Sequence, residues 1–362
     1  MSTPQTVSND EFTNDAVAAE EKHDVYAAEV EKSSPRVLRV RALNPSEYTL
    51  SGTNTWFVGT GSSRILIDTG DGEQPGYVPL LREVMARNGI ERIQSIVVTH
   101  WHFDHLGGVP VLQEAFGPDL KVYKFLPEND NHASSKNSLP RDPYSVWPKK
   151  KFTPIVHGMV LACEGATLKF FHTPGHAVDH VIAVLKEENS MFTADNVLGA
   201  GSSVFGDLAV YLRSLATMLA LKPTNLYPGH GPTIMDSGAG EGQAHIQSYI
   251  QNRQKRIDSV LDALKHAATD SGSHGEMSSR DDESGDKSLT TASIVALVYA
   301  NKNIAPSLVP AATNNTLLVL RKLEQDGFVK LRSPNPSDNL YETVATLKWQ
   351  WTGNAQTQTA KY

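Results

Sequence analysis

The chain has 362 residues, of which 40% are hydrophobic and 20% are charged, and its formal net charge is −7. This length suits one large α/β domain with a small accessory one, and the negative charge argues against a surface devoted to the nucleic-acid backbone. The single cysteine, Cys163, excludes an intrachain disulfide and fits a reducing compartment.

The N-terminal segment is polar and acidic. Residues 1–35 contain few large apolar side chains, so we expect them to form a disordered acidic extension. They lack the apolar core of a secretory signal, and no part of the chain approaches the roughly 18 continuous apolar residues of a membrane span. We therefore expect a cytoplasmic protein without a membrane partner.

The main folded domain is expected to span residues 36–268. Alternating or apolar runs predict strands at residues 37–40, 55–58, 65–68, 95–98, 121–124, 167–171, 181–184 and 190–193. Helical spacing predicts helices over residues 77–88, 207–220 and 241–267. Strands and helices that interleave in two successive halves predict an α/β sandwich with its helices outside.

The C-terminal part has a different organisation. Residues 269–288 are acidic and rich in Ser and Gly, which predicts a flexible linker. Two helices and a strand then indicate a winged-helix-like module over residues 289–350, and residues 351–362 form a polar tail. The leucines at 317, 318, 320 and 323 share one helix face, which we expect to pack on the main domain or a second subunit rather than to read DNA.

The segment His100-Trp101-His102-Phe103-Asp104-His105 carries the most chemical information. Its four potential ligands lie just past a buried strand, where a loop can direct alternate side chains at one point. His100 and His102 can therefore share one metal ion, and Asp104 and His105 can reach a second. Imidazole and carboxylate suit zinc, and they also suit manganese or iron.

Three further segments each place one ligand at or just after an apolar run. They contain His176 in Thr-Pro-Gly-His, Asp195 in Phe-Thr-Ala-Asp-Asn, and His230 in Tyr-Pro-Gly-His-Gly. A metal site assembled across a sheet requires this shared strand-end position. An isolated histidine would be interpreted as an ordinary surface or core residue, but the combination of four such segments indicates a metal centre.

Two other residues near these motifs receive different interpretations. Asp68, in Ile67-Asp68-Thr69-Gly70, is expected to support the ligand loops through hydrogen bonds rather than to bind metal. His180 is left open between a structural histidine and one that supports the ligands or faces the substrate. The remaining histidines, including His172, are expected to have no part in the site.

Taken together, the motifs resemble the metallo-β-lactamase superfamily, from Gly52-Thr53-Asn54-Thr55 through Asp68-Thr69-Gly70 to Pro228-Gly229-His230-Gly231. The resemblance covers about residues 36–265. It is greatest to the branch with glyoxalase II, the beta-lactamase-like protein 2 nucleases and the fungal acyl-carrier-protein thioesterases of polyketide clusters. It implies an αββα sandwich with a small C-terminal winged-helix-like module and two Zn²⁺ ions per chain, with Mn²⁺ as an alternative.

The resemblance also implies how the ligands are shared between the two ions. The first ion is assigned to His100, His102 and His176, the second to Asp104, His105 and His230, and Asp195 is assigned as the bridge. The chain departs from the family pattern at two positions. Ala194 stands where glycine is usual, and Gly206 stands where an acidic residue is common, but neither change removes a ligand.

Two metal ions can lower the pKa of a shared water towards about 7, which supplies a hydroxide able to attack a carbonyl or phosphoryl centre. Asp104 is the candidate catalytic proton acceptor and donor. Our first hypothesis is a thioesterase of secondary metabolism that releases a polyketide from an acyl-carrier protein, by hydrolysis or by Claisen-type cyclisation. A polyketide synthase would be its partner, and Lys149–Lys151 could contact the acidic carrier.

Two other functions compete with this hypothesis. An endoribonuclease acting on single-stranded RNA would use the same site, and the winged-helix-like module supports this alternative, whereas the net charge and the acidic linker argue against it. A metal-free binding protein on the same fold is disfavoured because all seven ligand positions are filled. The acyl chain, the choice between zinc and manganese, and the oligomeric state are not determined by the sequence.

Overall fold

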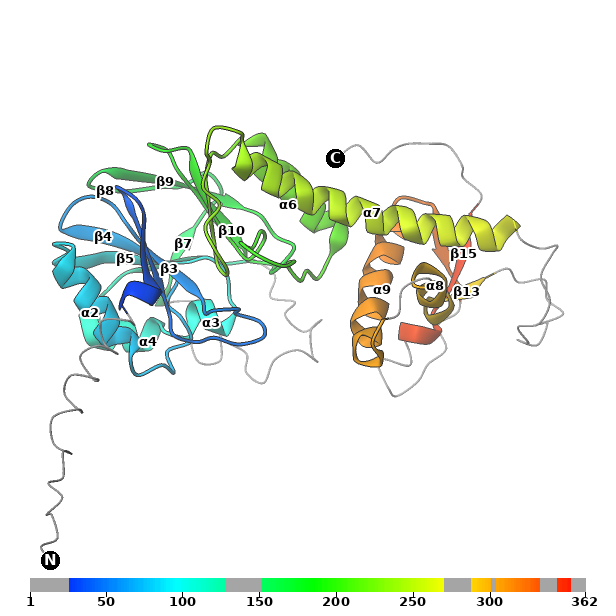
Figure 1. Ribbon diagram of the computed structural model, residues 1–362, viewed down its shortest axis with the longest axis horizontal. Helices are drawn as coiled ribbons and strands as arrows, with labels where there is room; N and C mark the ends of the chain where they lie inside the picture. Colours follow the sequence, from blue (N-terminus) through cyan, green and yellow to red (C-terminus); the bar gives the residue numbers. More distant parts are fainter. Residues whose placement is uncertain (1–25, 128–150, 270–287, 301–303, 333–343, 353–362) are drawn as a thin grey trace, which may run out of the picture. The chain divides into compact units, whose positions relative to one another are not determined.

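A computed structural model describes residues 26–127, 151–269, 288–300, 304–332 and 344–352 (Figure 1). The contacts within it divide the chain into two compact units. The first unit takes in the described residues of Met1–Ser203 and Lys222–Gly242, and the second takes in those of Val204–Leu221 and Gln243–Tyr362. Among the described residues, no helix is both long enough and apolar enough to cross a membrane.

The first unit contains a seven-stranded sheet with the strand order β1-β2-β3-β4-β5-β6-β7. Its strands are β1 (Val30–Ser34), β2 (Val37–Arg41), β3 (Asn54–Val58), β4 (Ser63–Ile67), β5 (Arg92–Val98), β6 (Val122–Phe125) and β7 (Thr153–Ile155). The strands from β1 to β4 pair antiparallel, whereas those from β4 to β7 pair parallel. The carboxyl ends of β4 and β5 and the amino end of β3 therefore lie at one edge.

A second sheet in the same unit has five strands in the order β12-β11-β10-β9-β8. They are β8 (Val160–Cys163), β9 (Ala166–His172), β10 (Val181–Leu185), β11 (Ser190–Ala194) and β12 (Leu226–Pro228). β10 is antiparallel to both β9 and β11, and β12 is parallel to β11. The carboxyl ends of β9, β11 and β12 consequently share one edge of this sheet.

Successive side chains of the first sheet point to opposite faces, and both faces are buried. Trp56, Ile65 and Val97 point to one cluster, which also contains Phe192 and Tyr227 of the second sheet. The intervening residues point to another cluster, which contains residues of α2 (Tyr77–Arg87) and α4 (Val109–Phe116). The first sheet is therefore packed between the second sheet and these helices, and Figure 1 shows α2 and α4 beside it.

The second unit is mostly helical, with a small sheet in the order β13-β15-β14. Its elements are α6 (Leu208–Ala220), α7 (Glu241–Thr269, from Gln243 onwards), β13 (Leu289–Thr290), α8 (Thr291–Val298), η3 (Pro306–Leu308), α9 (Val309–Gln325), β14 (Val329–Leu331) and β15 (Lys348–Trp351). Trp349 is fully buried, and its indole N–H donates to Thr291 Oγ1 at 3.0 Å. Leu317, Leu320 and Leu323 are buried where α9 packs on α8, β14 and α6.

The expectation of disorder through residue 35 is wrong for β1, which pairs with β2. The strand has little apolar surface beyond Val30, which packs against the core. Ion pairs lie along it: Glu31 contacts Arg39 at 2.7 Å, and Glu29, next to the strand, contacts Arg41 at 2.7 Å. Such cross-strand partners become visible only once the pairing is known.

The other domain boundaries stay predictions. The short strands β7 and β8 were not predicted, and α7 continues to Thr269. Most of the expected linker, at residues 270–287, and the tail from residue 353 lie outside the described residues, as do Lys149 and Lys150.

Leu66 lies fully buried between the first sheet and the helices. Replacing it with alanine should lower the free energy of unfolding by about 2–5 kcal/mol, because the substitution leaves a cavity in a close-packed core. Val160→Ala on β8 is the matched control, since Val160 is 46% exposed, and it should change stability by less than about 0.5 kcal/mol. Urea unfolding of both variants tests this, and equal losses would contradict the packing described.

Candidate metal centre

Seven predicted ligand side chains converge where the two sheets meet. His100, His102, Asp104 and His105 follow the carboxyl end of β5, partly on the short helix α3 (Phe103–Leu106). The other three, His176, Asp195 and His230, follow the ends of β9, β11 and β12. The backbone joins the two sheets at this edge, because Val181 N donates to Thr99 O at 2.9 Å and Asn54 N donates to Gly229 O at 2.7 Å.

The first group consists of His100, His102, His176 and Asp195, whose ligand atoms lie within 4.8 Å of one another. His102 Nδ1 is 3.0 Å from His100 Nε2 and 2.9 Å from His176 Nε2. The distance between the Nε2 atoms of His100 and His176 is 3.3 Å. Tetrahedral ligands at roughly 2.0–2.1 Å from a zinc ion stand about 3.3 Å apart, so this spacing fits one ion.

The second group consists of Asp104, His105 and His230. Asp104 Oδ2 lies 3.1 Å from the Nε2 atoms of both histidines, which are 3.3 Å from each other. Asp195 lies between the two groups: its Oδ2 is 3.2 Å from His230 Nε2 and 3.5 Å from His176 Nε2. Its Oδ1 is 3.4 Å from His105 Nε2.

Burial and donor type indicate that a divalent cation would fit both groups. Asp195 Oδ1 is buried and has no hydrogen-bond partner among the described residues. A Cβ atom at Gly229 would stand 2.1 Å from that oxygen, so only glycine leaves the carboxylate its space. Burial and the adjacent His176 hold the pKa of His102 at about 3, which leaves its imidazole neutral and able to donate a lone pair.

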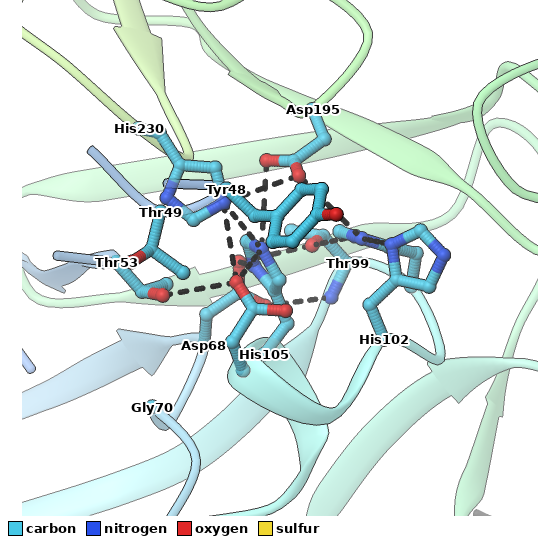
Figure 2. Close-up of polar contacts among 12 residues, drawn as sticks. Tyr48, Thr49, Thr53, Asp68, Gly70, Thr99, His102, His105, Asp195 and His230 are labelled. Atoms are coloured by element: carbon cyan, nitrogen blue, oxygen red, sulfur yellow. Dashed lines mark hydrogen bonds and ion pairs between the residues drawn. The ribbon is translucent and has the colours of Figure 1, made fainter. Parts of the chain in front are cut away.

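Asp68 and Thr99 determine which ring nitrogens face the centre (Figure 2). Asp68 Oδ1 accepts from Thr99 N, and Oδ2 accepts from Thr99 Oγ1, each at 2.9 Å. The Thr99 hydroxyl has one proton, which it donates to Asp68, so it can only accept a hydrogen bond from His100 Nδ1, at 3.0 Å. Asp68 Oδ2 is also 2.8 Å from His105 Nδ1. Both histidines therefore present Nε2 to the centre, and the supporting role predicted for Asp68 agrees with this geometry.

Thr53 and Asn54 belong to the Gly52–Thr55 motif, but no role was predicted for either. Thr53 Oγ1 donates to Asp104 Oδ2 at 3.0 Å and accepts from Asn44 Nδ2 at 3.1 Å. Asn54 Nδ2 donates to the carbonyls of Pro228 and Gly231, at 2.9 and 2.8 Å, on either side of the His230 loop. Their signal in the sequence is a run of polar residues at the start of an otherwise apolar buried strand.

A buried ion pair beside the centre was also missed. Lys124, on β6, and Asp179 have fully buried side chains and contact each other through Nζ and Oδ2. Asp179 Oδ1 also accepts from the backbone N–H of Trp101 at 3.3 Å, between His100 and His102. Through these two contacts, Asp179 ties the loop of His176 to the loop of His100 and to β6. Removing either member of the pair would leave the other charge buried without a partner. A lysine inside an apolar strand was the available signal.

His172, His180 and Ser203 belong to neither ligand group. His172 Nε2 lies 2.8 Å from Val178 O, and its ring stacks on Phe125. His180 is fully buried, with Nδ1 3.1 Å from Thr173 Oγ1 and its ring 5.4 Å from that of His100, so the structure makes it a packing neighbour of the ligands. Ser203 Oγ donates to Asp195 O at 2.5 Å and lies 3.4 Å from His176 Nδ1.

Asp68→Asn should weaken divalent-metal binding about 10–100-fold, because an amide cannot accept from both Thr99 and His105 in the observed arrangement. Asp71→Asn is the matched control: it makes the same change in the following loop, where the Asp71 side chain accepts from Glu73 N and Gln74 Nε2. Metal content after dialysis and competition with a chelating dye measure the effect. Unchanged affinity in Asp68→Asn would remove its supporting role.

The metal-free protein should depend on pH through His230. Burial by itself would lower the pKa of His230, but the Asp195 carboxylate and the hydrogen bonds to Asp104 and Asp195 raise it to about 9. Protonated His230 therefore stabilises the metal-free fold fully below about pH 6.5, and this contribution is lost as the pH rises towards 9. Histidine NMR and urea unfolding of chelator-treated protein test this. If the pKa of His230 stays high in an Asp195→Asn variant, the Asp195 carboxylate is not its cause.

Sequence comparisons agree with this arrangement. The family described as the metallo-beta-lactamase superfamily matches residues 48–230, which include all seven side chains. The beta-lactamase associated winged helix domain matches residues 290–333.

Individual proteins match over most of the chain. A beta-lactamase-like protein 2 homolog of Caenorhabditis elegans is 34% identical over 88% of this chain and 91% of its own length. The atrochrysone carboxyl ACP thioesterase nsrC of Aspergillus novofumigatus is 36% identical over 83% of this chain and 82% of its own. A beta-lactamase domain protein from Burkholderia ambifaria shares the fold, with a TM-score of 0.65, 16% identity and coverage of 90% and 94% of the two chains. The chain thus belongs to the metallo-β-lactamase superfamily and carries the winged-helix domain associated with it.

Proposed function

We propose that the chain is a dinuclear metal-dependent thioesterase that releases a polyketide acyl chain from an acyl-carrier protein. The superfamily consists generally of hydrolases, and the His/Asp cluster of this chain is compatible with divalent metal binding. The observation that carries the proposal is the position of Asp195 between two groups of converging ligands. The relative from A. novofumigatus, whose name describes an acyl-carrier-protein thioesterase, supports the substrate class.

In this proposal His100, His102 and His176 hold one ion, Asp104, His105 and His230 hold the other, and Asp195 serves both. Zinc is the first choice because five of the seven side chains offer imidazole nitrogen, while manganese stays an alternative. When bound, two such metal ions would supply a nucleophile from water near neutral pH and a Lewis acid for the carbonyl oxygen. A cytoplasmic location stays a prediction.

Asp104 is proposed to accept the proton of the attacking water and to return it. Its Oδ2 is held by Thr53, His105 and His230, whereas Oδ1 makes no hydrogen bond among the described residues. The side chain of Asp104 is 24% exposed, whereas that of Asp195 is 9% exposed. Burial opposes ionisation, but His105 and His230 hold the pKa of Asp104 well below its usual value, so the carboxylate is ionised at neutral pH.

A thioester suits this arrangement because the leaving thiolate needs little protonation. The chain's own residues then have three tasks: to hold the ligands in their tautomers, to exclude water from the buried side of the cluster, and to move one proton at Asp104. The first depends on Asp68 and Thr99, and the second on the completely buried His100 and His105.

The decisive experiment uses acyl-loaded carrier protein and follows the appearance of thiol. Release should require divalent metal, stop with a chelator and return when zinc is restored. Asp104→Asn should lower kcat by about 10²–10⁴-fold while keeping much of the metal, because the amide retains one ligand oxygen but cannot take the proton. His102→Ala should lose both metal and activity, whereas His157→Ala, an exposed histidine outside the cluster, should retain both.

Product analysis separates hydrolysis, which yields a free acid, from cyclising release. Labelled single-stranded RNA is tested in parallel because the sequence also allowed an endoribonuclease. RNA cleavage that Asp104→Asn abolishes, without any release from the carrier protein, would overturn the thioesterase and establish the alternative.

A further inference from the structure

An exposed tyrosine lies beside the metal centre, within the first unit. Among the large hydrophobic side chains that the structure describes, Tyr48 is the most exposed, at 82%. It belongs to the loop from β2 to β3, which ends at Thr53. The Thr53 hydroxyl donates to Asp104 Oδ2 at 3.0 Å, so this loop borders the cluster at its more exposed carboxylate. Figure 2 shows the Tyr48 ring over the cluster, between His230 and His102 in this view.

Hydrogen bonds within the loop hold its backbone in place. The hydroxyl of Ser46 accepts from the backbone N–H of Tyr48 at 3.2 Å and from that of Thr49 at 3.0 Å. Asn44 connects this turn to the cluster, because its carbonyl accepts from Thr49 Oγ1 at 2.6 Å and its Oδ1 accepts from Thr53 N at 2.9 Å. A loop that is ordered before binding loses little conformational entropy when its side chain contacts a ligand. The tyrosine is therefore preorganised for contact with a substrate.

Two more exposed apolar side chains stand in the ligand loops themselves. Phe103, between the ligands His102 and Asp104, is 41% exposed. Val178, two residues after the ligand His176, is 51% exposed. Single exposed apolar residues are ordinary on protein surfaces, whereas several of them around one site mark a surface that binds an apolar group. Together with the tyrosine, they favour an apolar binding partner at the centre.

The loops around the cluster contain neither lysine nor arginine. These loops comprise residues 43–52, 99–108, 173–180, 195–203 and 228–236. A charged group on a substrate needs a partner to offset the loss of its hydration, and a phosphodiester backbone in particular is bound through Lys and Arg. An uncharged group needs no such partner. The composition of the loops therefore favours an uncharged acyl group over an anionic one.

We infer that the acyl group brought to this centre is uncharged and carries a planar ring, which stacks on the side chain of Tyr48. An exposed phenol offers a flat face, and two aromatic rings attract each other more strongly than their buried area alone accounts for. Phe103 and Val178 contact the apolar remainder of the group. The inference rests on the thioesterase function proposed above. It names the chemical class of the acyl group and makes Tyr48 a specificity-determining residue.

The first test uses three pantetheine thioesters that differ only at the far end of the acyl group. Phenylpropanoyl has a planar ring, cyclohexylpropanoyl a ring of similar size that is not planar, and para-carboxyphenylpropanoyl a planar ring with a charge. Two methylene groups separate each ring from the carbonyl, so the three thioesters have similar intrinsic reactivity. With the full-length metal-loaded protein, kcat/KM should be about three- to tenfold higher for phenylpropanoyl than for cyclohexylpropanoyl. It should be at least about tenfold higher than for the charged thioester.

Tyr48→Ala should lower kcat/KM for the phenylpropanoyl thioester about three- to tenfold, chiefly through KM, and should remove the preference over cyclohexylpropanoyl. Its metal content should be unchanged. Tyr48→Phe keeps the ring and should keep the preference. Val160→Ala, which also truncates an exposed apolar side chain of the first unit, is the matched control and should leave all three thioesters unaffected. If Tyr48→Ala slows the three thioesters equally, Tyr48 only supports the loop and the inference is wrong.

A reversal of charge preference tests the second part of the inference. Tyr48→Arg places a cation where the loops have none, so it should raise kcat/KM for the carboxyphenylpropanoyl thioester relative to phenylpropanoyl about tenfold. Raising the salt concentration should reduce this gain. An unchanged ratio of the two thioesters in Tyr48→Arg would show that the ring end does not lie at this loop.

Binding of amide analogues, in which nitrogen replaces the thioester sulfur, separates this inference from the thioesterase proposal. Their affinities, measured by calorimetry, should follow the order of the three thioesters. That order without any thioester hydrolysis would overturn the thioesterase and leave the acyl-group assignment standing, whereas hydrolysis of all three at equal kcat/KM would overturn the assignment alone. Single-stranded RNA that binds through Tyr48, with no binding of the phenylpropanoyl amide, would show that the ring stacks on a base and that the inference is wrong.

Discussion

Face-to-face packing of two sheets is the constraint on which the rest of the first unit depends. The ring of Trp56 in the first sheet lies 5.8 Å from that of Phe192 and 5.1 Å from that of Tyr227 in the second. These contacts fix the separation and direction of the sheets, so the carboxyl ends of β5, β9, β11 and β12 meet at one edge. A strand displaced by one residue would turn its side chains to the opposite face. The aromatic core therefore sets the geometry of the ligand cluster, although its rings are not ligands themselves.

The ligands are oriented by hydrogen bonds from residues that do not belong to the two ligand groups. Asp68 and Thr99 fix the tautomers of one histidine in each group, and Asn54 clamps the loop of His230. Two non-glycine residues in this region have left-handed backbones, Asp68 at φ 60° and Ala194 at φ 43°. Such conformations cost free energy and persist where the surroundings determine them. Glycine adopts this conformation without strain, which gives a physical reason for the glycine that the resemblance led us to expect at position 194.

Charge is distributed differently in the two units. In the first, the cationic side chains near the edge strand pair with carboxylates, as Arg39 does with Glu31. In the second, two arginines of α7, Arg253 and Arg256, lie over aromatic rings and line a pocket without an acidic residue in its lining. A net charge is a sum over the whole chain, so an acidic total does not exclude a local basic site.

The sequence by itself determined the family, the fold class and the identity of the side chains that gather at the centre. It could do so because ligand types at strand ends follow a local pattern, as in His100–His105, and because periodicity reports which strand faces are buried. Tertiary structure alone decided what depends on partners distant in the chain: the pairing of β1 through ion pairs, the buried Lys124–Asp179 contact, the anchoring of Asp104 by Thr53, and the cavity between α7 and α9. The reason is physical. A local pattern fixes which groups a segment offers, whereas the energy of a hydrogen bond, a buried charge or a cavity depends on which other segment is brought within contact distance.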